Sequence, residues 1–416
     1  MFAGLFSNDL LRRGPPARYL WPMPPQTTGR RRIFRLVLSL GAGLTGHAGA
    51  QAQLPAAPLP AAPLPVAAQP PAAALPAPPP YRNLVMEGGG IRGIAYGGAL
   101  LELAQQGVLA RIERVGGTSA GAIQAALLAV GYSPQEIIEV VNSTPVQRLN
   151  DGRFIFFGGS HRLVKQYGWF RGDQLTTYLC ELVARKTQRP NLTLGELHEL
   201  VRQPPVPGAA GRFRDLYTTG TNLTRQRTQV FSHETHPTLR VADAVRISMS
   251  IPLYFRAVLL DAGGHVITGT PAPGQAVEVL VDGGLLANYP VDLFDYPRYL
   301  PAAAAAAAKV PDARGRVFNP ETLGLRLDRA EQIPFDTAAT GRLALAPYDI
   351  KDFNTYAGAL YTVALENLNP VQPADWQRTV SINILNFSPK IRRVSDAQKK
   401  QLLDGGRDGV RAFLRK

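Results

Sequence analysis

Short apolar runs ended by glycines alternate with segments of helical period along the chain. The run 83–86 stops at a glycine cluster, and the run 108–115 stops at a glycine pair. Helix-like segments follow these runs at 97–104 and 122–128. Strands that alternate with helices in this order are typical of a parallel sheet with crossover helices. We therefore expect an α/β fold.

The rest of the chain adds further elements and two segments that are harder to interpret. Strands are expected at 216–222, 229–231, 277–281, 323–327 and 380–385, and helices at 173–186, 241–250, 302–308 and 395–413. Residues 148–172, rich in Phe, Gly and Arg, lack a clear period and predict a partly apolar flap. Most of 312–375 shows no pattern, and the sequence contains no internal repeat.

The N-terminal part differs from the rest. In residues 1–50, arginines at 30–32 precede a short apolar run and small residues, which predicts a signal peptide cleaved near Ala50. We expect export to the periplasm or the medium, with a start at either Met1 or Met23; a cytoplasmic protein with a basic tail is the alternative. Residues 51–80 are almost entirely Ala, Pro, Leu, Val and Gln, which predicts an extended linker before a folded domain at 81–416.

The chain is basic, with a formal net charge of +14. Part of this charge lies in the leader, and about +8 remains once residues 1–51 are removed. Such a charge suits an anionic membrane surface. Nucleic acid is a poor partner, because the basic residues form no motif and are not interleaved with aromatics. The single cysteine, Cys180, excludes an intrachain disulfide.

A Gly-x-Ser-x-Gly motif stands between a predicted strand and a predicted helix. Strand, motif and helix in this order are typical of a nucleophile elbow. The turn is too tight for side chains at Gly117 and Gly121, which flank the candidate nucleophile Ser119. At the start of a helix, free N–H groups and the helix dipole favour negative charge on the serine oxygen.

A glycine loop at 88–93 follows the first predicted strand. Consecutive glycines allow the backbone to approach a ligand closely, and parallel strands end at one sheet edge, so the loop is expected to face Ser119. The candidate oxyanion-hole residues are Gly88, Gly89, Gly90, Arg92 and Gly93. The loop also satisfies the dinucleotide-binding pattern, with Glu113 twenty residues beyond Gly93. However, Glu113 lies inside the predicted second strand, and a dinucleotide fold does not need a serine elbow.

A serine nucleophile needs a base, and Asp282 is the best candidate. It follows the predicted strand 277–281 and precedes two glycines, so we expect it at the same sheet edge as Ser119. A carboxylate becomes a stronger base when burial raises its pKa. No histidine follows Asp282, which excludes the order serine, acid, histidine of α/β hydrolases. The histidines of the folded part lie in segments without a catalytic or metal-binding motif: His161, His198, His233, His236 and His265.

Three motifs together resemble those of the patatin-like phospholipase family. They are the glycine loop at 88–93, the elbow at 117–121 and the Asp-Gly-Gly sequence at 282–284. The stretches 247–252 and 288–291 also resemble the family's segments before and after the aspartate strand. The resemblance covers a core at about 83–300, and the C-terminal extension is expected to complete the domain.

The resemblance implies a three-layer α/β/α fold with a mainly parallel central sheet. It also implies a lipid acyl hydrolase that works through a Ser119–Asp282 dyad and an acyl-enzyme, without a metal or organic cofactor. The expected partner is a lipid or another ester at a membrane surface, with peripheral membrane contact. Two alternatives remain: a Ser-His-Asp esterase that uses an earlier histidine, and a catalytically silent lipid-binding protein on the same fold.

Overall fold

The structure is a computed structural model. It describes residues 81–144, 149–151, 158–204, 211–301, 305, 315–338, 345–367, 373–385, 387 and 394–415. The leader and linker predicted at 1–50 and 51–80 lie outside these residues, as do part of the flap predicted at 148–172 and nearly all of the helix predicted at 302–308. Each helix of the described residues is too short or too polar to cross a bilayer.

An eight-stranded mixed sheet forms the centre of the domain, in the order β10-β9-β1-β2-β4-β8-β7, with β5 also paired to β4. Five strands run parallel: β1 (Asn83–Met86), β2 (Arg114–Gly117), β4 (Asp215–Asn222), β9 (Thr322–Asp328) and β10 (Thr379–Asn383). Three further strands form antiparallel pairs. Strands β5 (Arg227–Phe231) and β8 (Glu278–Asp282) each pair with β4, and β7 (Val258–Leu260) pairs with β8. A separate small sheet pairs β3 (Gly168–Phe170) with β6 (Leu253–Phe255). The predicted α/β class with a mainly parallel sheet is confirmed.

Strands β2 and β8 lie end to end along one edge of β4. Thr218 of β4 is paired with β2 on one side and with β5 on the other. Residues 220–222 of β4 pair with β5 on one edge and with β8 on the other. Strand β8 therefore continues along the same edge of β4 as β2, beyond the point where β2 ends. Gly117 lies opposite Thr218, and Asp282 lies opposite Gly220. The last residues of two strands that run in opposite directions therefore meet.

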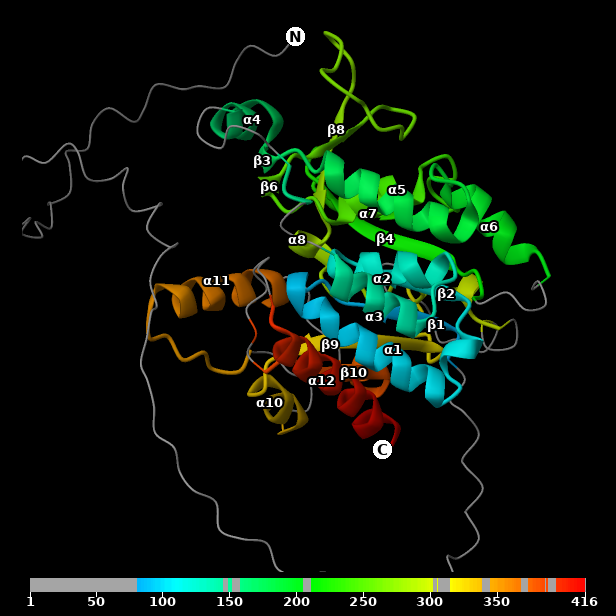
Figure 1. Cartoon of the computed structure of the whole chain (residues 1–416), viewed down its shortest axis with the longest axis vertical. Helices are drawn as coiled ribbons and strands as arrows, with labels where there is room; N and C mark the ends of the chain where they lie inside the picture. Colours follow the sequence, from blue (N-terminus) through cyan, green and yellow to red (C-terminus); the bar gives the residue numbers. More distant parts are fainter. Residues whose placement is uncertain are drawn as a thin grey trace, which may run out of the picture. The chain divides into compact units, whose positions relative to one another are not determined.

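Helices cover the two faces of the sheet unequally. The main helical face and its flanks contain α1 (Ala95–Gln105), α2 (Ala120–Ala129), α3 (Pro134–Ser143), α5 (Asp173–Thr187), α6 (Leu194–Arg202), α7 (Val241–Ser248) and α12 (Asp396–Leu414). Figure 1 shows α1 and α12 packed side by side across the strands. The other face is covered by α8 (Gly284–Ala287), η5 (Pro297–Tyr299), η6 (Pro373–Arg378) and residues 289–296 between α8 and η5.

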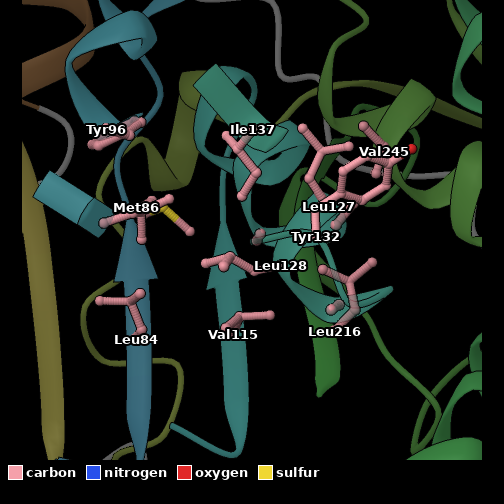
Figure 2. Close-up of a cluster of buried hydrophobic side chains, with 14 of the residues drawn as sticks. Leu84, Met86, Tyr96, Val115, Leu127, Leu128, Tyr132, Ile137, Leu216 and Val245 are labelled. Atoms are coloured by element: carbon pink, nitrogen blue, oxygen red, sulfur yellow. The ribbon is translucent and has the colours of Figure 1, made fainter. Parts of the chain in front are cut away.

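Side chains from alternate strand positions build the core beneath the helices. Figure 2 shows Leu84, Met86, Val115 and Leu216 pointing from the strands toward α2, where Leu128 meets them. All are fully or almost fully buried. Intervening positions such as Tyr217 face the second layer instead. Successive side chains of a strand point to opposite faces of the sheet, so alternate residues pack into the two different layers.

Three helix starts are fixed by local sequence. Capping boxes, in which side chain and backbone exchange hydrogen bonds, open α3, α6 and α12 at Ser133, Thr193 and Ser395. The remaining described helices are η2 (Gly90–Ile94), η3 (Leu109–Arg111), α4 (Gly158–Gln166), α10 (Gln332–Ala338) and α11 (Phe353–Asn367). In the region 312–375, the strand predicted at 323–327 is confirmed as β9, and the part that showed no pattern in the sequence contains α10, α11 and the start of η6.

The second strand differs from its prediction at 108–115. Residues 109–111 form the helical turn η3, and β2 begins only at Arg114. The guanidinium of buried Arg214 donates to the carbonyls of Leu109 and Ile112 at 3.1 Å each. These carbonyls are therefore satisfied by a side chain rather than by a neighbouring strand.

Candidate active site

Ser119 lies in a sharp turn between β2 and α2. Its backbone angles are φ 52° and ψ −119°, a conformation that is costly for a residue with a side chain. A Cβ atom at Gly121 would lie 2.3 Å from the Met86 carbonyl oxygen, and one at Gly117 would lie 2.7 Å from the same atom. Only glycine fits at these two positions because the turn is pressed against the end of β1.

Hydrogen bonds fix this turn from three sides. The N–H of Ser119 donates to Ser248 Oγ at 2.9 Å, at the end of α7. Thr118 Oγ1 donates to the carbonyl of Ala287 at 2.6 Å and lies 2.6 Å from Thr219 Oγ1. Since Thr118 has one hydroxyl proton, Thr219 is the donor in the second contact. The strained conformation of Ser119 is thus held by α7, β4 and the last residue of α8.

Asp282 is buried at the end of β8. Its N–H donates to the Ser250 carbonyl at 2.9 Å, and its Oδ1 accepts the N–H of Gly284 at 2.7 Å. Burial raises the pKa of Asp282 to about 6, although the Gly284 N–H and the Ser119 hydroxyl both favour the charged form. The Asp282 carboxylate is therefore close to Ser119 and more basic than an exposed aspartate.

The prediction that Asp282 reaches Ser119 at a common carboxyl edge of parallel strands is wrong in its geometry. Strand β8 is antiparallel to β4 and points toward β2 from beyond its end. The two residues are adjacent because the strand ends abut. In this structure the Ser119 hydroxyl donates to Met249 Sδ at 3.5 Å.

Four of the five described histidines make their contacts elsewhere, and His161 is exposed on α4. His198 and His233 lie against Asp215, His236 against Gln229 and Thr235, and His265 against Asp261. Among the described residues, no hydrogen bond or ion pair joins a histidine to Ser119 or Asp282.

The glycine loop lies against Ser119. A Cβ atom on Gly88 would be 3.3 Å from Ser119 Cβ and 2.4 Å from Asn288 Oδ1. The N–H of Gly88, predicted as an oxyanion donor, instead donates to the Asn288 carbonyl at 2.9 Å. That part of the prediction is wrong, because the amide proton is already used. The N–H groups of Gly89 and Gly90 have no hydrogen-bond partner within the part of the chain that the structure describes.

Arg92 and Gly93 shape the loop. The backbone N–H and Nε of buried Arg92 both donate to the Gly89 carbonyl, at 3.2 and 3.1 Å. This bond fixes the Gly89 peptide. A Cβ atom at Gly93 would lie 2.9 Å from Ala120 Cβ, so glycine here allows η2 to pack against the first turn of α2.

An apolar pocket of about 140 Å³ begins at the loop and the elbow. Gly90, Ala120 and Met249, which lie at or beside the loop and the elbow, are among its lining residues. The walls come from α2, α3 and α5, among them Ile123, Val140, Leu175, Leu179 and Leu182. The Thr144 hydroxyl in the wall donates to the Val140 carbonyl and pairs with the Tyr178 hydroxyl at 2.7 Å. Because most of the lining side chains are aliphatic, the pocket is suited to an apolar ligand.

A larger cleft of about 740 Å³ opens on the opposite face of the sheet. Tyr217, Thr219, Tyr296 and Tyr299 line it together with charged residues such as Arg298. Neither Ser119 nor the glycine loop lines this cleft. The small pocket is therefore the one connected to the candidate chemistry.

The sequence motifs gave no role to two residues that hold the site. Ser248 accepts the Ser119 N–H, and Asn288 holds the loop through its carbonyl and through Nδ2, which donates to the Gly88 carbonyl at 3.3 Å. In the sequence, these two residues were marked only by their position in the stretches 247–252 and 288–291, which extend the family resemblance.

Known proteins share this part of the chain. Residues 84–295 match the model of a family described as patatin-like phospholipase. The uncharacterized protein YqhO of Bacillus subtilis (strain 168) is 31% identical over 55% of this chain and 72% of its own length. A probable lipid hydrolase of Invertebrate iridescent virus 6 is 24% identical over 51% of this chain and 63% of its own length. An uncharacterized protein of Acanthamoeba polyphaga mimivirus is 29% identical over 51% of this chain. The match spans 61% of that protein.

Proposed function

Because the chain belongs to the patatin-like phospholipase family, we propose that it hydrolyses carboxylic ester bonds of lipids, with Ser119 as nucleophile and Asp282 as its base. The observation that carries this proposal is the buried carboxyl of Asp282 beside the Ser119 hydroxyl, with its pKa raised to about 6. A base is most effective when its pKa lies near the working pH. At neutral pH Asp282 is mostly ionised, and it is about two units more basic than an ordinary aspartate.

In the first step, the Ser119 hydroxyl turns from Met249 to Asp282 and gives up its proton to the carboxylate. The oxygen attacks the ester carbonyl carbon, and the carbonyl oxygen takes on negative charge. The free N–H groups of Gly89 and Gly90 are suited to bind this oxyanion. Collapse of the intermediate breaks the bond to the alcohol, which leaves with the proton from Asp282.

In the second step, water attacks the acyl-enzyme and Asp282 accepts its proton. The same N–H groups would stabilise the second oxyanion. The bond between the acyl group and Ser119 breaks, and the proton returns to the serine oxygen. The products are a carboxylic acid and the free enzyme, and the chemistry uses only residues of this chain.

The apolar pocket supports an acyl group of limited length. Its volume of about 140 Å³ is close to that of engineered apolar cavities of roughly 150 Å³ that admit benzene. By that comparison the described pocket holds an acyl chain of about six carbon atoms. We assign the acyl side of the ester to this pocket, because its lining includes Gly90 of the glycine loop, Ala120 next to Ser119, and Met249, which accepts the Ser119 hydroxyl.

Turnover of p-nitrophenyl butyrate by the purified full chain tests the proposal. Ser119→Ala should reduce the rate to background, and Asp282→Asn should reduce it by about 10²–10⁴-fold. The matched control is Asp396→Asn, which changes a fully exposed aspartate in the first turn of α12, outside the pocket lining, and should leave the rate unchanged. Circular dichroism confirms folding. Unchanged turnover in either dyad variant would exclude the dyad.

Two measurements distinguish the alternatives. A fluorophosphonate probe should label Ser119 in the wild type and leave Ser119→Ala unlabelled; a catalytically silent lipid-binding protein would not be labelled. Replacing His236 and His265 together should preserve turnover, whereas its loss would favour a histidine-dependent esterase. These two residues contact Thr235 and Asp261 and do not contact Ser119 in the structure.

A further inference from the structure

Three side chains meet near the start of β4, away from the candidate active site. His198 comes from α6, Asp215 is the first residue of β4, and His233 follows β5. Nδ1 of His198 lies 2.8 Å from Asp215 Oδ1, and Nδ1 of His233 lies 3.6 Å from the same oxygen. The two imidazoles are stacked, with centroids 3.8 Å apart and planes inclined by 5°. Both Nδ1 atoms therefore lie near one carboxylate oxygen.

The contacts in this cluster leave one group unsatisfied. His198 forms a hydrogen bond with Asp215, whereas 3.6 Å is too long for a hydrogen bond from His233. His233 Nδ1 is buried and has no hydrogen-bond partner among the described residues. A buried nitrogen without a partner is costly, and native proteins rarely contain one without a reason. A positive ion between the three groups would satisfy it.

The donor set and spacing fit a transition-metal dication. Two imidazole nitrogens and a carboxylate oxygen lie within 4.8 Å of one another. Zn²⁺ bonds of roughly 2.0–2.1 Å place neighbouring ligands of a tetrahedron about 3.3 Å apart. The separations of 2.8 and 3.6 Å lie on either side of that value. We propose that His198, Asp215 and His233 bind a transition-metal dication of the Zn²⁺ type.

The neighbouring residues hold these ligands in place. Glu234 is not available as a fourth ligand, because its two oxygens accept the hydroxyls of Tyr217 and Tyr299 at 2.9 and 2.7 Å. These bonds fix the loop that carries His233, and the edge of Tyr217 packs against its ring. The side chains of His198 and His233 are 29% and 18% exposed, which leaves an entry path and room for water as the fourth ligand.

The position of the cluster indicates a structural role. Asp215 is paired with Arg114 at the start of β2, whereas Gly117 and the elbow lie at its other end. Three residues of strand separate these points by about 10 Å. A metal bound by Asp215 would therefore not contact an ester at Ser119. It would instead join α6, β4 and the loop after β5, and so stabilise the fold.

Titration of the chelator-treated, dialysed full chain with Zn²⁺ tests this inference. Calorimetry should detect one site, and the melting temperature should rise with added Zn²⁺ but not with Mg²⁺. His198→Ala and His233→Ala should each weaken binding at least about tenfold, while His265→Ala, which removes an exposed histidine, should bind as the wild type does. Absence of binding by the wild type, or equal affinity in all variants, would overturn the proposal.

A measurement on the unaltered protein covers the case in which a variant fails to fold. Diethylpyrocarbonate modifies accessible histidines, and mass spectrometry locates the modified residues. Zn²⁺ should protect His198 and His233 and leave the modification of His265 unchanged. Equal modification of all three residues with and without Zn²⁺ would contradict a metal site here. Esterase activity serves as a separate readout and should persist in both cluster variants.

Discussion

The carboxyl of Asp282 is buried beside the hydroxyl of Ser119 because β8 and β2 meet end to end along β4. The same burial that brings the two groups together raises the pKa of Asp282 to about 6. A more basic carboxylate is useful for catalysis, but a buried charge opposes folding. Activity and stability should therefore respond to pH in opposite directions.

The first prediction concerns the pH dependence of hydrolysis. If ionised Asp282 is the base, kcat/KM should rise as pH increases through about 6 and level off above it, because this ratio reports the ionisation of the free enzyme. Initial rates with p-nitrophenyl butyrate between about pH 4.5 and pH 8 give the profile, with activity at neutral pH rechecked after each exposure. A flat profile across this window would contradict the assignment of Asp282.

The second prediction concerns the stability of Asp282→Asn. Because the pKa of Asp282 is raised on folding, the wild type loses stability as pH rises from about 4 to 6, and this loss persists above pH 6. Asparagine carries no charge and can still accept the Gly284 N–H. The variant should therefore be more stable than the wild type at pH 8, by up to about 3 kcal/mol at about 1.4 kcal/mol per pKa unit.

Urea unfolding of both proteins at several pH values checks this prediction. The difference in unfolding free energy between the variant and the wild type should be close to zero near pH 4 and should increase as pH rises through 6. Since all other groups titrate equally in the two proteins, their contributions cancel in the difference. A gap that is independent of pH would mean that the charge on Asp282 is not the cause.

The third prediction concerns backbone strain at Ser119. Alanine would keep the unfavourable φ of 52°, whereas glycine adopts positive φ easily. Ser119→Gly should therefore be more stable than Ser119→Ala by about 1–2 kcal/mol, although both lack the nucleophile. Ala120→Gly, one residue later in α2, is the matched control and should be destabilising. Equal stability of the two Ser119 variants would argue against strain.

The fourth prediction concerns acyl-chain preference. Ile123 lines the apolar pocket, so Ile123→Ala should enlarge it and shift the preferred p-nitrophenyl ester toward longer chains. Wild-type kcat/KM should be highest for chains of about four to six carbons, in keeping with the pocket volume. Leu200→Ala, on α6 and outside the pocket, should leave the profile unchanged. An unchanged profile in Ile123→Ala would place the acyl chain elsewhere.

The sequence predicted most of the architecture but little of the geometry at the site. Apolar runs ended by glycines correctly predicted β1 and the helices that follow β1 and β2, because local pattern determines those elements. The antiparallel direction of β8 was not predictable, since a strand's pattern is the same in both directions. The signal peptide predicted at 1–50 stays a prediction.

Long-range contacts explain what the motifs missed. The Gly88 amide is occupied by Asn288, two hundred residues away along the chain, and no local pattern reports this. Likewise His198, Asp215 and His233 lie in three different elements, and their spacing matches no metal-binding motif. Such sites become visible only when the fold brings the residues together.

Strand β4 sets the distance between the ends of β2 and β8, because both strands pair with it. Gly117 and Asp282 are opposite Thr218 and Gly220, so a single residue, Thr219, sets the gap between the two strand ends. Inserting or deleting one residue there would alter that gap and turn every later side chain of β4 to the other face of the sheet. This strand can therefore vary in sequence far more readily than in length.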